Sequence, residues 1–205
     1  MDNAWRIFWQ IIKDNKKMNW RATIIFVVAL IAGLFLSLDN QVMIEVLEQL
    51  SEVVEGLDDS NVFSLIQYIF INNATVALLM ILLGFIFAIV PFFVLVFNGV
   101  FIGFFTKLFL SDGGSLFEYF VSLAPHGILE LPAIVLAGAY GFKLGSVVWN
   151  GIKGMISGHR IDNVRDRFAS GLREMVIFII GILIMLLIAA IIESTISLWL
   201  TMLFN

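Results

Sequence analysis

Long apolar runs separated by short polar stretches are the main pattern along this chain. Residues 22–38 hold no charged residue over 17 positions, and residues 62–106 hold none over 45 positions. A helix that crosses the hydrocarbon core of a bilayer needs about 20 mostly apolar residues. The first run therefore predicts one membrane span, and the second predicts two spans joined by a tight turn. Pro91, which lacks an amide proton and disfavours helix at the residue before it, predicts that turn near Val90–Phe92.

Two further spans follow in the second half of the chain. Residues 119–142 contain one charged residue, Glu130, and residues 175–192 contain none. The pattern predicts an all-α fold, a polytopic transmembrane helix bundle that forms one integral membrane domain over residues 1–205. Its five expected spans cover residues 22–38, 72–90, 92–110, 119–148 and 174–195.

The composition indicates that lipid is the solvent of this chain. Hydrophobic residues make up 60% of it and charged residues 14%, which excludes a soluble enzyme because a water-exposed surface needs more charge. The net charge of −4 argues against nucleic acid as a partner, since phosphates require a basic face. With no cysteine and two histidines, the sequence predicts neither a metal site nor a bound cofactor.

The distribution of charge predicts the orientation of the spans. Residues 39–61 hold seven acidic residues and no basic one. Loops rich in lysine and arginine stay in the cytoplasm, so we expect the N-terminus inside, the C-terminus outside and a multi-pass protein of the cell membrane. Eleven of the twelve basic residues lie before the first span or around the link between the fourth and fifth: Arg6, Lys13, Lys16, Lys17, Arg21, Lys143, Lys153, Arg160, Arg165, Arg167 and Arg173.

Three segments are expected outside the hydrocarbon core. Residues 1–21 carry apolar and basic side chains at helical spacing and predict an amphipathic helix on the inner membrane surface, whose apolar face is made by Trp5, Phe8, Trp9 and Ile12. Residues 39–61 predict an external acidic amphipathic helix, either simply solvated or a docking surface for a protein partner. Residues 149–173 are expected to form a cytoplasmic basic loop.

Small residues recur along the spans at the spacing that lets membrane helices approach closely. The first span has Ala29, Gly33 and Ser37, and the third has Gly99 and Gly103 next to Asn98. The fourth span carries the longest stripe, which consists of Ala133, Ala137, Gly141 and Gly145. Such a stripe can serve a second copy of the chain as readily as another span, so a homo-oligomer is one option.

Polar residues of the expected spans form a candidate functional cluster. His126 and Glu130 lie four residues apart on one helix face, and the asparagines Asn72, Asn73 and Asn98 are the available polar partners. Close to them, Pro125, Gly127 and Pro132 predict a kink or a half-helix in the fourth span, with Pro125 opening a helix and Pro132 removing an interior hydrogen bond. The cluster is either a structural polar lock or part of a transport or catalytic site.

The run Pro-His-Gly-Ile-Leu-Glu-Leu-Pro-Ala at residues 125–133, followed by Ala137-Gly138-Ala139 and Gly141, resembles the signature of the stage II sporulation protein M family. Asn72-Asn73, Asn98-Gly99 and Gly103 stand where that family has an Asn-Asn pair entering the second span and an Asn-Gly with a later glycine in the third. The resemblance covers the whole chain, most strongly residues 72–145, and implies five crossings.

The resemblance also bears on function. The name-giving member of that family anchors a septal membrane complex with two peptidoglycan-degrading partners and has no established catalytic activity of its own. We therefore expect a noncatalytic membrane scaffold that recruits protein partners. The alternative is a small permease or channel subunit that uses the polar cluster on broken helices. An intramembrane hydrolase ranks last, because one histidine and one glutamate do not assign a nucleophile and its base.

Overall fold

The computed structural model describes residues 2–37, 48, 62–86, 88–156 and 164–204, and within them the chain forms six helices and no strand. The helices are α1 (Asp2–Asp14), α2 (Lys16–Phe35), α4 (Val62–Leu82), α5 (Ile89–Ser111), α6 (Leu116–Ile156) and α7 (Val164–Phe204). Five of them contain a stretch long and apolar enough to cross a membrane, at Lys16–Phe35, Val62–Leu82, Ile89–Ser111, Gly127–Gly154 and Arg173–Ile196. This confirms the predicted all-α bundle with five apolar spans.

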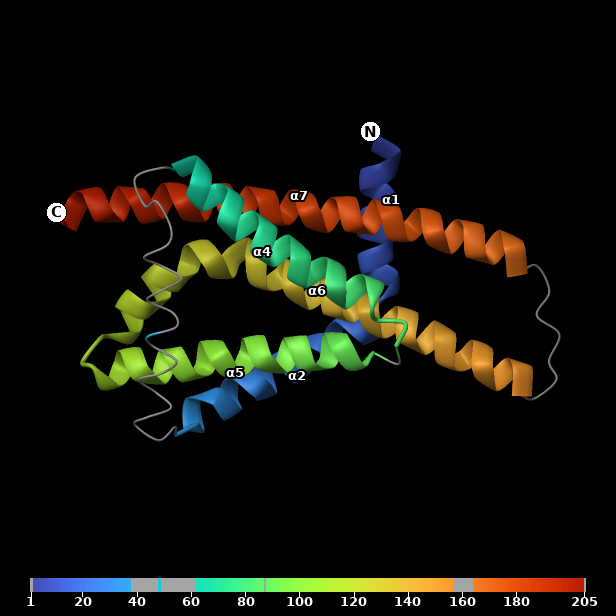
Figure 1. The fold of residues 1–205 in the computed structure, drawn as a ribbon, viewed down its shortest axis with the longest axis horizontal. Coiled ribbons are helices and arrows are strands. Elements are labelled where there is room, and N and C mark those ends of the chain that lie inside the picture. The colour runs from blue at the N-terminus through green and yellow to red at the C-terminus, as the bar shows by residue number, and fades with distance from the viewer. Residues whose placement is uncertain (1, 38–47, 49–61, 87, 157–163, 205) are drawn as a thin grey trace.

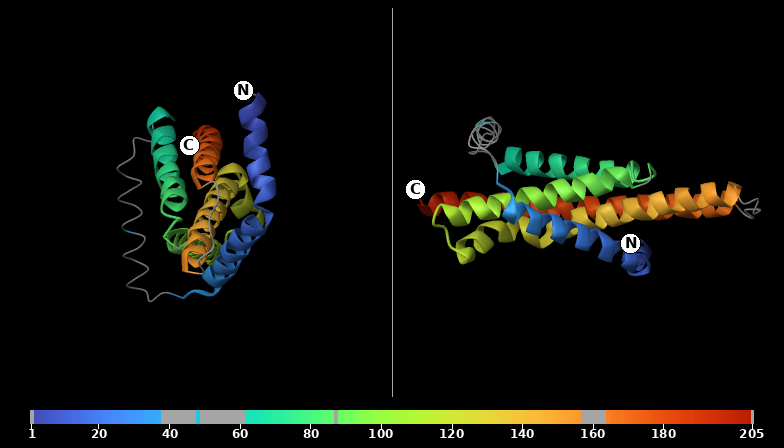
Figure 2. Two further views of the ribbon diagram at one scale, coloured as in Figure 1. Left: turned by 90° about the vertical axis from the view of Figure 1, so that its right-hand side faces the viewer. Right: turned by 90° about the horizontal axis from the view of Figure 1, so that it is seen from below.

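The long helices run side by side, and α6 and α7 continue past the ends of α2, α4 and α5 on one side of the molecule (Figures 1 and 2). We call this side the hairpin end. The short helix α1 crosses α7 at a steep angle and does not run along the bundle (Figure 1). The bundle therefore has a five-helix body, a two-helix extension at the hairpin end and a crosswise helix near the base of that extension.

Helices α2 and α5 pack at backbone distance because small residues face one another. A Cβ atom added at Gly99 would lie 2.6 Å from the carbonyl oxygen of Phe26 and 2.8 Å from Cβ of Ala29. Cβ atoms at Gly33 and Gly103 would overlap the carbonyl oxygens of Val100 and Leu30. Close approach of this kind holds membrane helices together where the hydrophobic effect does not.

The small-residue stripe of α6 packs inside the chain. Ala133, Ala137, Gly141 and Gly145 are all buried. A Cβ at Gly145 would lie 2.7 Å from the amide nitrogen of Ala88, and one at Gly141 would overlap the carbonyl oxygen of Met80. The stripe is thus used by α4 and by the turn that follows it, so it does not offer itself to a second copy of the chain.

The turn between the second and third spans lies earlier than expected. Helix α4 ends at Leu82 and α5 begins at Ile89, so the turn precedes Val90–Phe92. Ala88 ends the turn in a left-handed conformation with φ 62°. Pro91 lies in the first turn of α5, where backbone N–H groups have no helical carbonyl to bond, so the absence of an amide proton on proline does not destabilise the helix. Helix α4 therefore begins ten residues before the expected start of the span at residue 72, which places Asn72 and Asn73 in its middle.

Helix α6 is continuous through both of its prolines. It begins at Leu116, so the prediction that Pro125 opens a helix is wrong, and Pro132 also lies inside the helix. The axis of α6 changes direction within its first half (Figure 1). Proline is the usual cause of such a bend because it removes a backbone hydrogen bond and crowds the preceding turn.

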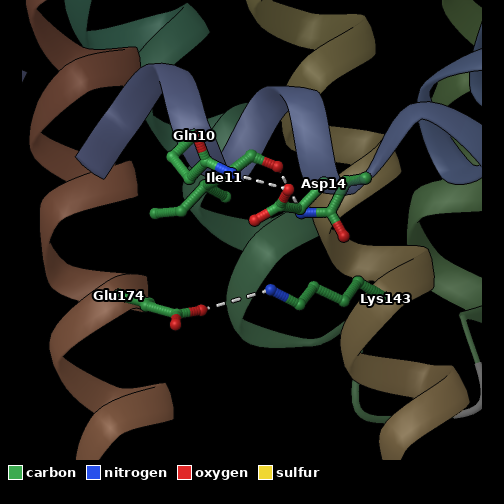
Figure 3. Close-up of polar contacts among 6 residues, drawn as sticks. Gln10, Ile11, Asp14, Lys143 and Glu174 are labelled. Atoms are coloured by element: carbon green, nitrogen blue, oxygen red, sulfur yellow. Dashed lines mark hydrogen bonds and ion pairs between the residues drawn. The ribbon is translucent and has the colours of Figure 1, made fainter. Parts of the chain in front are cut away.

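The expected basic loop at residues 149–173 is largely helical. Helix α6 continues to Ile156 and α7 begins at Val164, which leaves only residues 157–163 outside the description. Lys143 of α6 forms an ion pair with Glu174 of α7, with 3.4 Å between Nζ and Oε2 (Figure 3). This pair ties the two helices where they leave the bundle. The expected acidic helix at residues 39–61 lies outside the described residues except for Glu48.

Helix α1 docks on the bundle through aromatic stacking. Phe8 and Ile11 are buried, and the ring of Phe8 stacks on that of Phe178 in α7 with 5.6 Å between centroids. Gly181 makes room for this ring, since a Cβ there would overlap it. Trp5 and Trp9 stay about half exposed. The predicted apolar face is therefore divided, because Phe8 contacts protein while the two tryptophans remain available to headgroups.

Candidate functional site

A cavity of about 670 Å³ lies between α4, α5 and α6. Its wall consists of three asparagines, a glutamate, a tyrosine and a row of apolar side chains: Asn72, Asn73, Val76, Leu79, Phe93, Val94, Phe97, Asn98, Phe101, Ile102, Phe105, Tyr119 and Glu130. Binding sites for small ligands typically have this size and this mixture of an apolar wall with a few polar groups.

The cavity brings together four of the five polar residues singled out from the sequence. Glu130 of α6 is 2% exposed and lies at its wall with Asn72 and Asn73 of α4 and Asn98 of α5. The Nδ2 atom of Asn72 donates to Oδ1 of Asn73 over 3.5 Å. The Nδ2 atom of Asn98 donates to the carbonyl oxygen of Val94 over 2.8 Å. Each of these bonds uses one of the two N–H donors of its amide, so Asn72 and Asn98 each keep one N–H donor and a side-chain oxygen that can accept a hydrogen bond.

A ridge of phenylalanines, which sequence reasoning missed, borders the polar groups. Phe93, Phe97, Phe101 and Phe105 recur every fourth residue on α5 and line the cavity. Ring centroids lie 6.0 Å apart between Phe97 and Phe101 and 4.6 Å apart between Phe101 and Phe105. Phe97 is 69% exposed, so the ridge leads from the cavity to the outer surface of the bundle. The four-residue spacing was the signal that could have revealed it.

Tyr119 is a second lining residue that the sequence did not single out. Its hydroxyl donates to the carbonyl oxygen of Ile102 over 3.3 Å, which links the start of α6 to α5. Its ring lies 5.5 Å from that of Phe109, centroid to centroid. Tyr119 therefore bounds the cavity on the side away from the hairpin end.

A polar face of α4 continues the cavity toward the start of that helix. A second hollow of about 520 Å³ is lined by Ser64, Gln67, Tyr68, Ile71, Asn72, Thr75 and Val76, and it shares Asn72 and Val76 with the first. Gln67, Tyr68, Asn72 and Thr75 are exposed. Amide and hydroxyl groups on a membrane helix are expensive in lipid, so this face requires water, a polar ligand or another protein against it.

Toward the hairpin end the cavity is bounded by closely packed side chains of α4, α5 and α6. Met80 and Ile81 of α4, Leu95 of α5 and Ala137 of α6 are fully buried. A Cβ at Gly138 would lie 2.7 Å from Cδ1 of Leu95, so α5 and α6 touch closely here. Within the described residues, the cavity therefore ends in packed side chains.

The remaining predicted site residues fall outside the cavity wall. The side chains of Pro125 and His126 lie outside the described part of the structure, so their predicted partnership with Glu130 stays a prediction. Gly127 and Pro132 lie within α6. Gly99, Gly103, Ala133, Ala137, Gly141 and Gly145 are buried in helix contacts and position the polar residues. No group of three metal-ligating side chains occurs among the residues described.

Comparison with known proteins gives one match. The model of the family described as stage II sporulation protein M matches residues 22–198, which is most of the chain. No curated protein and no solved structure shows a significant similarity to it. The matched region includes four of the five apolar stretches completely and the first from residue 22 onward, and it includes every described residue of the cavity wall.

Proposed function

We propose that this chain, which belongs to the stage II sporulation protein M family, is a noncatalytic scaffold that recruits protein partners at the cell membrane. Family membership and five apolar helices make it a membrane protein. The proposal adds that its multi-pass body anchors a surface at the membrane boundary, where the apolar stretch Gly127–Gly154 ends, to which other proteins bind.

The projecting α6–α7 hairpin carries this proposal. Trp149, Ile152 and Ile156 are spaced three and four residues apart, so they share one face of α6, and Ile156 is 82% exposed. The Nζ atom of Lys153 lies over the Trp149 ring at 5.1 Å from its centroid. We call Trp149, Ile152 and Ile156 the hairpin face. An exposed apolar face with basic surroundings suits a protein that presents apolar and acidic side chains.

The tight packing of the bundle also supports a scaffold. Helices α2 and α5 meet at Gly33, Gly99 and Gly103, and α6 meets the α4–α5 turn at Gly145. Contacts between backbones cannot slide without losing their fit. A body of this kind holds the hairpin at a fixed place relative to the membrane, which is what assembly of a complex requires.

A photoreactive amino acid at Ile156 tests the scaffold. In living cells we expect it to form discrete higher-mass adducts, because the hairpin face contacts a partner. The same amino acid at Ile184, a half-exposed residue of the α7 span, serves as the control that faces lipid and forms none. Replacing Ile152 and Trp149 by serine should remove the adducts formed at position 156 without lowering the melting temperature. Adducts that are absent at 156, or unchanged by these serines, would contradict the proposal.

The cavity favours a second candidate, a small permease. It holds a buried carboxylate and three amides at membrane depth, where such groups often mark a solute or proton pathway. The closed packing toward the hairpin end opposes it in this conformation. Purified protein in proteoliposomes should show no uptake above empty vesicles for protons, sodium or small amines. Uptake that disappears in intact Glu130→Gln protein would favour the permease over the scaffold.

A further inference from the structure

We infer that the cavity between α4, α5 and α6 is a binding site for a membrane lipid whose headgroup carries a primary ammonium group. The inference goes beyond the scaffold, because it needs no protein partner. It rests on three adjoining surfaces with different chemistry: an acceptor-rich pocket, a donor-rich helix face and an aromatic ridge.

The pocket matches a donor-bearing cation. Asn72 and Asn98 each contribute a side-chain oxygen that can accept a hydrogen bond, and one of the two N–H donors of each amide is already used within the protein. Glu130 adds a buried carboxylate, and no lysine or arginine occurs among the residues that line the cavity. A primary ammonium group has three N–H donors and a positive charge, which complement these oxygens. A trimethylated ammonium keeps the charge but has no donor.

The polar face of α4 supplies neutral hydrogen-bond donors next to the pocket. Ser64, Gln67, Tyr68 and Thr75 carry hydroxyl or amide donors, and the hollow that they line joins the pocket at Asn72. The phosphate of a phospholipid lies beside its ammonium group and requires donors. A headgroup that extends along this face would place its phosphate near the α4 side chains and its ammonium near Glu130.

The aromatic ridge suits the hydrocarbon part of the ligand. Phe93, Phe97 and Phe101 form an apolar strip from the cavity to the surface of the bundle, and Phe93 and Phe97 are mostly exposed. Acyl chains can lie along this strip and continue into the surrounding bilayer. The cavity therefore matches a lipid over its whole length, whereas a small soluble amine would leave the ridge uncovered.

Lipid binding to the purified full chain tests the inference by native mass spectrometry in detergent. Phosphatidylethanolamine should bind about tenfold more tightly than phosphatidylcholine, which retains the charge but lacks N–H donors, and more tightly than phosphatidylglycerol. Equal binding of the three lipids would overturn the inference. Free ethanolamine that competes as well as the lipid would show a soluble amine site and overturn the lipid assignment.

Substitutions locate the site. Glu130→Gln removes the charge and replaces one acceptor oxygen by an NH₂ donor group, so it should remove most of the preference for phosphatidylethanolamine over phosphatidylcholine. Glu174→Gln makes the same chemical change at the hairpin, away from the cavity, and should leave the preference intact. If the Glu130 variant does not fold, Asn72→Leu tests the lipid site instead. Asn72 is exposed, so the fold should tolerate its replacement. A preference that survives in the Asn72 variant would place the bound lipid elsewhere and overturn the inference.

Discussion

Replacing Gly99 and Gly103 together by leucine will abolish the folded bundle. A Cβ at Gly99 would lie 2.6 Å from the Phe26 carbonyl oxygen, and one at Gly103 would overlap that of Leu30. Both obstacles are backbone atoms of α2, which cannot rotate aside as a side chain does. Overpacking by a single group typically costs about 1–3 kcal/mol, and two leucines would force the helices apart against a typical total stability of about 5–15 kcal/mol. Size-exclusion chromatography in mild detergent should show aggregate and no monodisperse peak.

Gly151 and Gly154 provide the matched control for this substitution. They lie in the α6 part of the hairpin, and a Cβ at either position would meet nothing within 4 Å. Replacing both by leucine should leave the elution profile unchanged and should raise the melting temperature slightly, because leucine favours helix over glycine by up to about 1 kcal/mol per site. A double variant at Gly99 and Gly103 that melts like the parent protein would show that α2 and α5 do not pack as described.

The five apolar helices could be predicted from the sequence, but their ends could not. Apolar runs of about 20 residues have few alternatives to a membrane helix, since lipid leaves no other way to satisfy the backbone. Where a helix leaves the lipid, the apolar run ends although the helix continues, so the run no longer marks the end of the helix. Residues 149–156 continue α6 although two glycines and a lysine there suggest the start of a loop, and α4 begins ten residues before the expected start at residue 72. The sequence predicts the turn too late in the chain because Pro91 indicates a break in a helix, whereas the first turn of a helix accepts proline.

The candidate site was predictable in its polar members and not in its shape. Asn72, Asn98 and Glu130 stood out because polar groups are costly in a membrane span. Their convergence depends on the rotation of three helices about their axes, which is set by contacts such as Gly138 with Leu95 and Gly141 with Met80. The sequence pattern of one helix does not reveal which face a neighbouring helix turns toward it. Apolar lining residues such as Phe97 were invisible for another reason, because phenylalanine in a span is ordinary.

The scaffold and the lipid site are compatible because they use opposite ends of the molecule. The hairpin face lies on the extension of α6, whereas the cavity ends at the packed layer formed by Met80, Leu95 and Ala137. Loss of the preference for phosphatidylethanolamine in Glu130→Gln protein should therefore leave crosslinking at Ile156 unchanged. The serine variants of the hairpin face should in turn leave lipid binding unchanged, so either proposal can fail alone.

If the chain crosses the membrane an odd number of times, the labelling of single cysteines from outside the cell should be all or none. Because the chain has no cysteine, single cysteines can be introduced without removing others. Suitable positions are Asn3 in α1, Asp112 in the turn after α5 and Gly154 in the hairpin, since Asn3 and Asp112 are exposed and Gly154 has no atom near its Cβ position. Asp112 lies at the opposite end of the bundle from the hairpin, because α6 runs between them.

In intact cells a membrane-impermeant maleimide should label Asp112→Cys fully and leave Asn3→Cys and Gly154→Cys at background. Lysis should expose both of the latter. The expectation follows from the basic residues before α2 and in the hairpin, which the membrane potential and the insertion machinery retain in the cytoplasm. Labelling of Gly154→Cys in intact cells would invert the orientation and place the hairpin face outside. Equal labelling at Asn3 and Asp112 would mean that the chain crosses an even number of times between them, which contradicts the three spans α2, α4 and α5.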